Sequence, residues 1–263
     1  MRGDIQSVQL SELHEYRDLH LVQADRVLLC VIGGVEPETL QPAMEEQLGT
    51  ISLTAETFPQ PTVSPEIAKD QNATWDVNTT HYMETYAIPN IKNRDYPVLY
   101  MASLLLRVAC MQNAQLKELT GHVFCGVDLI TPKQVYLYVS ASPKPDTDIE
   151  KVKQRIGQLA NQLKLPANNT QVPMYAQYLS MEFGSSPDMT MVMQQKPVDV
   201  TETMMLLRLG LMWGMLDHQY GDTLPQLASA FADVSATDVA SVVNRYLTED
   251  HRMTLVLTPR IPE

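Results

Sequence analysis

Apolar residues recur along this chain with two periods, and the alternation of those periods predicts an α/β fold. Continuous or alternating apolar runs predict strands at 26–32, 75–88, 123–130, 135–139 and 252–257. Helical spacing of apolar positions predicts helices at 11–22, 36–48, 95–119, 146–163, 173–183, 201–218, 224–231 and 237–247. Residues 56–70 contain three prolines and little periodic pattern, which indicates a linker.

The stretch from residue 116 to residue 142 joins a helix end to two strand-like runs. The long apolar helix closes at Leu119, and we expect Gly121 to supply a left-handed cap after it. Either Asp146 or Thr147 is expected to open the next helix. The simplest interpretation of a helix that runs into a hairpin is packing in the core.

The beginning and the end of the chain follow one pattern. A shift of 226 residues places Ser11 on Thr237 and the run 26–31 on the run 252–257 without a gap. Both copies consist of a capped helix, a short turn and an apolar strand. A helix followed by a strand is common, so this repeat alone does not establish a duplication.

The order of residues from 117 to 124 resembles the R-E-x-x-G-L-A-Y segment of pitrilysin-type zinc metallopeptidases, which include insulin-degrading enzyme and mitochondrial processing peptidase. Lys117 stands at the Arg position and Phe124 at the Tyr position, while Glu118 and Gly121 match. The resemblance implies that in the catalytic members the Arg and the Tyr hold substrate over a zinc ion carried by another domain. Lys117 and Phe124 are therefore candidate substrate-binding residues.

Both candidate residues have changed functional groups. Lys117 keeps the positive charge of Arg but loses the bidentate fork. Phe124 keeps the ring of Tyr but has no hydroxyl to donate. Two interpretations stay open: a weakened substrate clamp, or a domain that has drifted to a scaffold role.

The resemblance extends to the ends of the chain and implies a domain organisation. Residues 33–38, Gly-Gly-Val-Glu-Pro-Glu, are similar to the family's G-D-V-D-P-E junction, and the family is built from duplicated domains. We therefore expect residues 1–55 to be the tail of a preceding domain, 56–71 a linker, and 72–263 a complete domain. The implied fold is an α/β sandwich with a mixed, mainly antiparallel sheet flanked by helices.

The chain lacks the zinc motifs of this class, since neither H-x-x-E-H nor H-E-x-x-H occurs. His14 and His20 lie six residues apart, which is too far for two ligands on one helical turn. His81 and Glu84 lie three apart in a predicted strand and would point to opposite faces. We expect no metal site and no cofactor in this chain, which alone should be inactive; zinc is expected in a partner domain or subunit.

Composition narrows the range of partners. The net charge of −12, without any cluster of Lys or Arg, argues against nucleic acid as a partner. The apolar run 204–216 is too short to span a bilayer and contains Arg208.

Cys30, Cys110 and Cys125 lie in apolar surroundings and are expected to be buried, reduced thiols. No signal peptide is visible after Met1, and neither periplasm nor cytoplasm is favoured.

The leading hypothesis is a non-catalytic domain of a pitrilysin-like zinc metallopeptidase that forms half of a peptide-binding chamber. Its expected partners are a zinc-bearing catalytic domain or subunit and a peptide. The alternative is a catalytically inactive structural or interaction module of the same fold. A second copy of the chain is a further candidate partner, because strand 26–32 would otherwise have open edges.

Overall fold

The computed structural model describes residues 7–20, 36–49, 70–131, 134–184, 211, 214–215 and 220–260. The predicted strand 26–32, Cys30, most of the linker and most of the predicted helix 201–218 lie outside the described residues. The chain divides into two units, which are described separately. The first comprises residues 1–64 and 187–218, and the second comprises residues 65–186 and 219–263.

The described part of the first unit includes the helices α2 (Leu10–His20) and α3 (Pro37–Leu48). Their positions confirm the helices expected at 11–22 and 36–48. Glu36 has an extended backbone and precedes Pro37 in the first turn of α3. Proline is favoured there because the first amide groups of a helix need no intrahelical partner.

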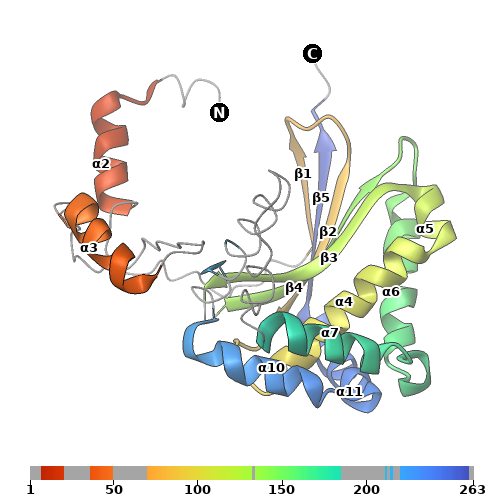
Figure 1. The fold of residues 1–263 in the computed structure, drawn as a ribbon. Coiled ribbons are helices and arrows are strands. Elements are labelled where there is room, and N and C mark those ends of the chain that lie inside the picture. The colour runs from red at the N-terminus through yellow and green to blue at the C-terminus, as the bar shows by residue number, and fades with distance from the viewer. Residues whose placement is uncertain are drawn as a thin grey trace, which may run out of the picture. The chain divides into compact units, whose positions relative to one another are not determined.

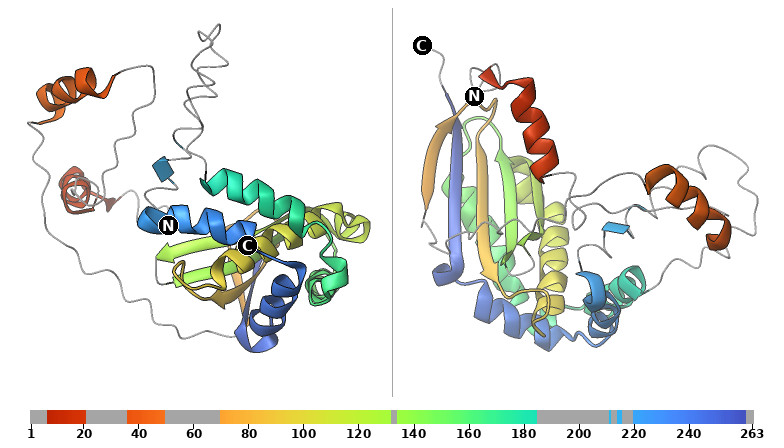
Figure 2. Two further views of the ribbon diagram at one scale, coloured as in Figure 1. Left: turned by 60° about the horizontal axis from the view of Figure 1, so that its bottom comes forward. Right: turned by 90° about the vertical axis from the view of Figure 1, so that its left-hand side faces the viewer.

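The second unit is built on a five-stranded sheet in the order β1-β5-β2-β4-β3. The strands are β1 (Gln71–Trp75), β2 (His81–Ile88), β3 (Thr120–Thr131), β4 (Gln134–Pro143) and β5 (Arg252–Pro259). Only the β1–β5 pair is parallel, and the other three neighbouring pairs are antiparallel. The right-hand view of Figure 2 shows the strands side by side in this order. This arrangement confirms the predicted mixed, mainly antiparallel sheet.

Helices of this unit pack on the sheet or on the helices that cover it, and alternate residues of the central strands are buried. They are α4 (Tyr96–Gln112), α5 (Ala114–Leu119), α6 (Ile149–Leu163), α7 (Val172–Gly184), α10 (Leu224–Ala232) and α11 (Ala236–Tyr246), seen in Figure 1. Tyr82, Glu84, Tyr86 and Ile88 of β2 are buried, whereas the residues between them are half-buried. Within the described parts of the chain, no helix combines the length and apolarity needed to cross a membrane.

The strand predicted at 75–88 is in fact two strands. β1 ends at Trp75 and β2 begins at His81, and each pairs with a different edge of β5. The connection 76–80 contains Asp76, Asn78 and two threonines, and Asp and Asn are poor strand formers. The continuous prediction was wrong because it ignored this polar interval.

The helix predicted at 95–119 is interrupted at Asn113. This residue has an extended backbone, with φ −73° and ψ 115°, and follows the last turn of α4. Its side chain accepts a hydrogen bond of 2.9 Å from the backbone amide of Leu116, so it caps the new helix α5. The prediction of one long helix was therefore wrong because a capping residue lies within it.

The prediction of a left-handed glycine cap at Gly121 is also wrong. Thr120 ends α5 with an extended backbone, and its amide and hydroxyl both donate to the carbonyl of Leu116. Gly121 already belongs to β3, and its φ is not positive; among the described glycines only Gly221 has a positive φ. A β-branched residue with a donor hydroxyl thus satisfies the helix end and starts the strand without a turn.

Two further helices begin at residues other than those predicted. Asp148, not Asp146 or Thr147, caps α6 by accepting a hydrogen bond from the amide of Glu150. Ser235 caps α11, where its side chain accepts from the amide of Asp238 and the Asp238 carboxylate accepts from the amide of Ser235. This reciprocal pair is the capping box, which places the N-cap two residues before Thr237, so that the helix begins at Ala236.

Glu84 is the one acidic residue in the buried core of the described chain. Its carboxylate accepts hydrogen bonds from the hydroxyls of Tyr82 (2.7 Å) and Tyr86 (3.2 Å). Burial nevertheless raises the pKa of Glu84, against the opposing effects of the two hydroxyls and of Arg252. The folded carboxyl therefore holds its proton to a higher pH than it does in the unfolded chain.

Replacing Glu84 by Gln is expected to remove a loss of stability that the wild-type protein shows above pH 4.5. In this range the folded state binds more protons than the unfolded state, so the free energy of unfolding falls as pH rises through the folded pKa. The loss amounts to about 1.4 kcal/mol for each unit by which the pKa is raised. Urea unfolding of both proteins between pH 5 and pH 8 measures it. Exposed Glu118→Gln is the control; equal pH dependence of wild type and Glu84→Gln would contradict the prediction.

Candidate functional site

Lys117 and Phe124 line one groove at the β3 end of the sheet. Lys117 lies in the last turn of α5 and is exposed, while Phe124 lies on β3 with 38% of its surface exposed. The groove has a volume of about 690 Å³ and receives residues from α4, α5, β3 and α7. Its lining consists of Leu104, Arg107, Val108, Cys110, Met111, Lys117, Thr120, Gly121, His122, Val123, Phe124, Tyr175 and Tyr178.

Hydrogen bonds to backbone carbonyls hold the α5–β3 junction in place. The Lys144 amide donates to the Leu119 carbonyl at 2.9 Å, and the Lys144 ammonium donates to the Lys117 carbonyl at 2.8 Å. The hydroxyl of Thr147 also donates to the Leu119 carbonyl, at 3.2 Å. The carbonyls of Lys117 and Leu119, which a helix end normally leaves without partners, thus accept hydrogen bonds, and these bonds fix the position of the Lys117 backbone.

The Phe124 ring lies in a stack of aromatic and cationic groups. Its centroid is 6.0 Å from that of Tyr138 on β4, with the two rings inclined by 30°. Gly126 makes room for this pair, because a Cβ atom there would lie 3.3 Å from Phe124 Cε1 and 3.4 Å from the Tyr138 hydroxyl. The Arg107 guanidinium carbon lies 5.8 Å from the Phe124 centroid, within the range of a cation–π interaction.

Arg107 is the site residue that the sequence analysis missed. It is the only charged residue in α4, whose remaining residues are apolar or neutral. A single cation in an otherwise apolar helix is a signal that could have identified it, because such a group needs a partner or access to solvent. The ion pairs among the described residues include neither Arg107 nor Lys117.

A smaller cavity of about 270 Å³ adjoins the groove and shares Leu104, Arg107, Phe124 and Tyr178 with it. Glu182 of α7 also lines this cavity. Burial raises the pKa of the Glu182 carboxyl, while a hydrogen bond from Tyr178 and the charge of Arg107 oppose the rise. Arg107 therefore lines both hollows, and of the two only the smaller one is also lined by an acidic side chain.

The cysteines near this site are not activated as nucleophiles, and the described residues near it do not form a metal-binding group. Cys110 and Cys125 are free and buried, as predicted, and burial raises the pKa of Cys110 to about 12 and that of Cys125 well above its ordinary value. Thiols of this kind are poor nucleophiles at neutral pH. No group of three or more His, Cys, Asp or Glu side chains in the described ranges could hold a metal ion, so these residues do not fit a zinc site.

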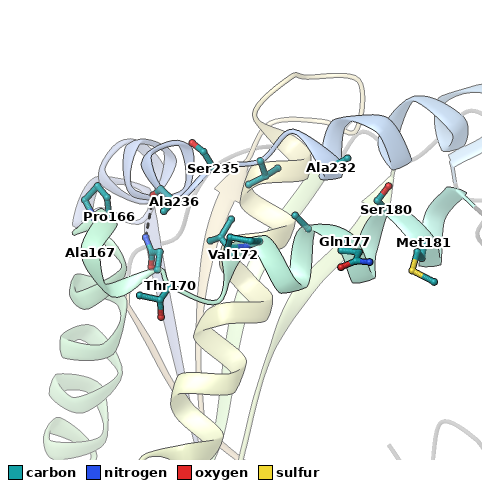
Figure 3. A pocket seen from close by; sticks show the side chains of 14 residues that line it. Pro166, Ala167, Thr170, Val172, Gln177, Ser180, Met181, Ala232, Ser235 and Ala236 are labelled. Atoms are coloured by element: carbon teal, nitrogen blue, oxygen red, sulfur yellow. Dashed lines mark hydrogen bonds between the residues drawn. The ribbon is translucent and has the colours of Figure 1, made fainter.

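A second hollow, of about 770 Å³, lies between α7 and the start of α11 (Figure 3). No titratable side chain lines it. The Asn169 amide nitrogen donates to the carbonyls of Leu163 (2.9 Å) and Ala236 (3.4 Å), and thus ties the end of α6 to the start of α11. This hollow lacks the charged groups that distinguish the groove at Lys117, which we therefore take as the candidate site.

Residues 7–171 match the protein family described as the peptidase M16 inactive domain. A search of curated proteins found no match.

Solved structures with the same fold include a protease from Helicobacter pylori, with a TM-score of 0.66 and 17% identity over 98% of this chain. They also include a peptidase M16 inactive domain from Pseudomonas fluorescens, with a TM-score of 0.58 and 13% identity over 98% of this chain. The matches cover 61% and 59% of those two chains, so this chain spans about three fifths of their length.

Proposed function

Because this chain belongs to the peptidase M16 family as one of its inactive domains, we propose that it forms the non-catalytic half of a peptide-binding chamber. The catalytic half supplies the zinc ligands and the general base, either from the same polypeptide or from a separate subunit. Lys117 and Phe124 contact the peptide from the non-catalytic side. This division of roles agrees with a described chain that lacks a zinc-binding set and carries a groove lined by cations and aromatic rings.

The observation that carries this proposal is that Lys117 and Phe124 line the same groove although one lies on a helix and the other on a strand. The Lys117 ammonium can donate hydrogen bonds to peptide carbonyls, and the Phe124 ring offers an apolar surface to a peptide side chain. Both side chains are accessible, so a peptide in the groove can reach them.

An inactive structural or interaction module of the same fold is the second candidate. The observation that favours it is the loss of both groups that the family resemblance assigns to substrate binding. Position 117 has no guanidinium and position 124 has no hydroxyl. A domain that only supports its partner needs neither group.

Reconstitution with a candidate catalytic partner that carries H-x-x-E-H distinguishes the two functions. We expect no peptide cleavage by this chain alone, and stimulation of the partner's cleavage when the chain is added. The Lys117→Ala/Phe124→Ala variant should lower the stimulated rate about tenfold or more, because a charged hydrogen bond and an aromatic contact are both removed. Exposed Lys151 on α6 provides the matched control, Lys151→Ala.

The results of this experiment distinguish the chamber proposal from the structural module. Full stimulation by the double variant would refute the clamp and support the structural module. A chain that binds the partner without changing its rate would refute the chamber proposal altogether.

A further inference from the structure

The guanidinium of Arg107 lies in the groove, and its charge opposes the rise in the pKa of its acidic neighbour Glu182, which lines the adjoining cavity and not the groove. It lies over the Phe124 ring at 5.8 Å, and that ring is held by Tyr138 at 6.0 Å. No carboxylate of the described residues forms an ion pair with Arg107. A stacked guanidinium has lost part of its conformational freedom, so a ligand that binds its free edge meets a preorganised fork of donors.

The groove is locally basic although the chain is acidic. Arg107, Lys117 and His122 line it, and none of its lining residues is Asp or Glu. The whole chain has a net charge of −12, which repels acidic peptides in general. Any preference of the chain for an acidic peptide would therefore come from a local site and not from its overall charge.

Apolar side chains flank the cations. Leu104, Val108 and Met111 of α4 and Tyr175 and Tyr178 of α7 line the same groove. The volume of about 690 Å³ falls within the range of roughly 300–1,000 Å³ that is typical of ligand sites. Arg107 also lines the adjoining cavity, which gives a bound chain space on a second side of the guanidinium, where Glu182 would face a non-acidic part of the peptide. This favours an internal acidic side chain over a terminal carboxylate.

We propose that the groove is a subsite for an internal Asp or Glu of a bound peptide, with apolar residues beside it. Arg107 binds the carboxylate through its fork, and Lys117 adds a second positive charge. The inference rests on the proposed function in one respect, which is that the ligand is a peptide. It adds a residue, Arg107, and a charge preference that the positions of Lys117 and Phe124 alone do not give.

The test measures the binding of labelled peptides to the full 263-residue chain by fluorescence anisotropy. Three peptides share their length and apolar residues: one with a central Glu and an amidated C-terminus, one with a central Gln and an amidated C-terminus, and one with a central Gln and a free C-terminus. We expect the Glu peptide to bind about tenfold or more tightly than the amidated Gln peptide, as for a charged hydrogen bond. This preference should shrink as salt is added.

Variants assign the preference to the groove. Arg107→Gln should abolish it, Arg107→Lys should retain part of it, and the control Lys151→Gln, which removes the same charge from the surface of α6, should leave it unchanged. Thermal unfolding shows whether Arg107→Gln folds. If it does not, Lys117→Gln at an exposed position replaces it, and a reduced preference is expected there too.

The outcomes separate this inference from the proposed function. Equal binding of the Glu and amidated Gln peptides overturns the acidic subsite and leaves the chamber proposal standing. Tighter binding of only the peptide with a free C-terminus also overturns it, in favour of a terminal-carboxylate site. Absence of binding by all three peptides counts against both proposals.

Discussion

Replacing Lys117 by Arg and Phe124 by Tyr together is expected to raise the partner-dependent rate of peptide hydrolysis by about one to four powers of ten. The double variant returns a planar fork at position 117 and a hydroxyl donor at position 124. Each hydrogen bond to a charged group contributes roughly 1.5–3 kcal/mol. Phe124 is 38% exposed and Lys117 is exposed, so the new groups can reach a peptide in the groove.

This gain requires a zinc-bearing partner, so the measurement is hydrolysis of one peptide with and without the candidate catalytic domain. Each single variant should give part of the increase, and Lys151→Arg, away from the groove, should give none. An unchanged partner-dependent rate in the double variant would show that these positions no longer face the substrate. The structural-module reading would then replace the clamp.

Replacing Phe183 by Ala is expected to lower the free energy of unfolding by about 3–5 kcal/mol. Phe183, on α7, is 1% exposed, and its ring centroid lies 4.8 Å from Phe231 and 5.5 Å from Tyr100. The three rings join α7, α10 and α4, and aromatic pairs of this kind add about 0.5–1.5 kcal/mol beyond their buried area. Domains are typically stable by only 5–15 kcal/mol, so the loss is a large fraction of the total.

Urea unfolding at fixed pH measures this change. Met181→Ala, two residues earlier on α7 and 61% exposed, is the matched control and should change stability by no more than about 0.5 kcal/mol. A loss below 1 kcal/mol in the Phe183 variant would mean that neighbouring side chains collapse into the space. The three helices would then not depend on this cluster.

Periodicity in the sequence predicted most of the strand positions and most of the helices, whereas the mixed, mainly antiparallel sheet was implied by the family resemblance. The alternation in 81–88 corresponds to the alternate burial of β2, and the apolar runs at 123–130, 135–139 and 252–257 became β3, β4 and β5. The spacing of seven between Lys117 and Phe124 also located the groove, through a family resemblance. These features depend on local patterns, which a single sequence contains.

The predictions failed at two kinds of position. At some, a side chain caps a helix within a continuous apolar pattern; at others, tertiary packing decides which residues meet. Asn113 and Thr120 satisfy helix ends through their own side chains, so apolar spacing continues across a break that it cannot reveal. Arg107 is ten residues from Lys117 in the sequence, and it enters the groove because α4 packs against β3. No periodicity indicates that contact. Only its isolation in an apolar helix could have drawn attention to it.

The direct passage from α5 into β3 has an evolutionary consequence. Insertions and deletions usually accumulate in surface loops, which absorb a change of length at little cost. No loop separates Lys117 from Phe124, because α5 ends at Leu119 and β3 begins at Thr120. One added residue would rotate the helix by about 100° or move Phe124 to the other face of the strand. The interval of seven residues should therefore resist length changes even while the residues at its two ends are replaced.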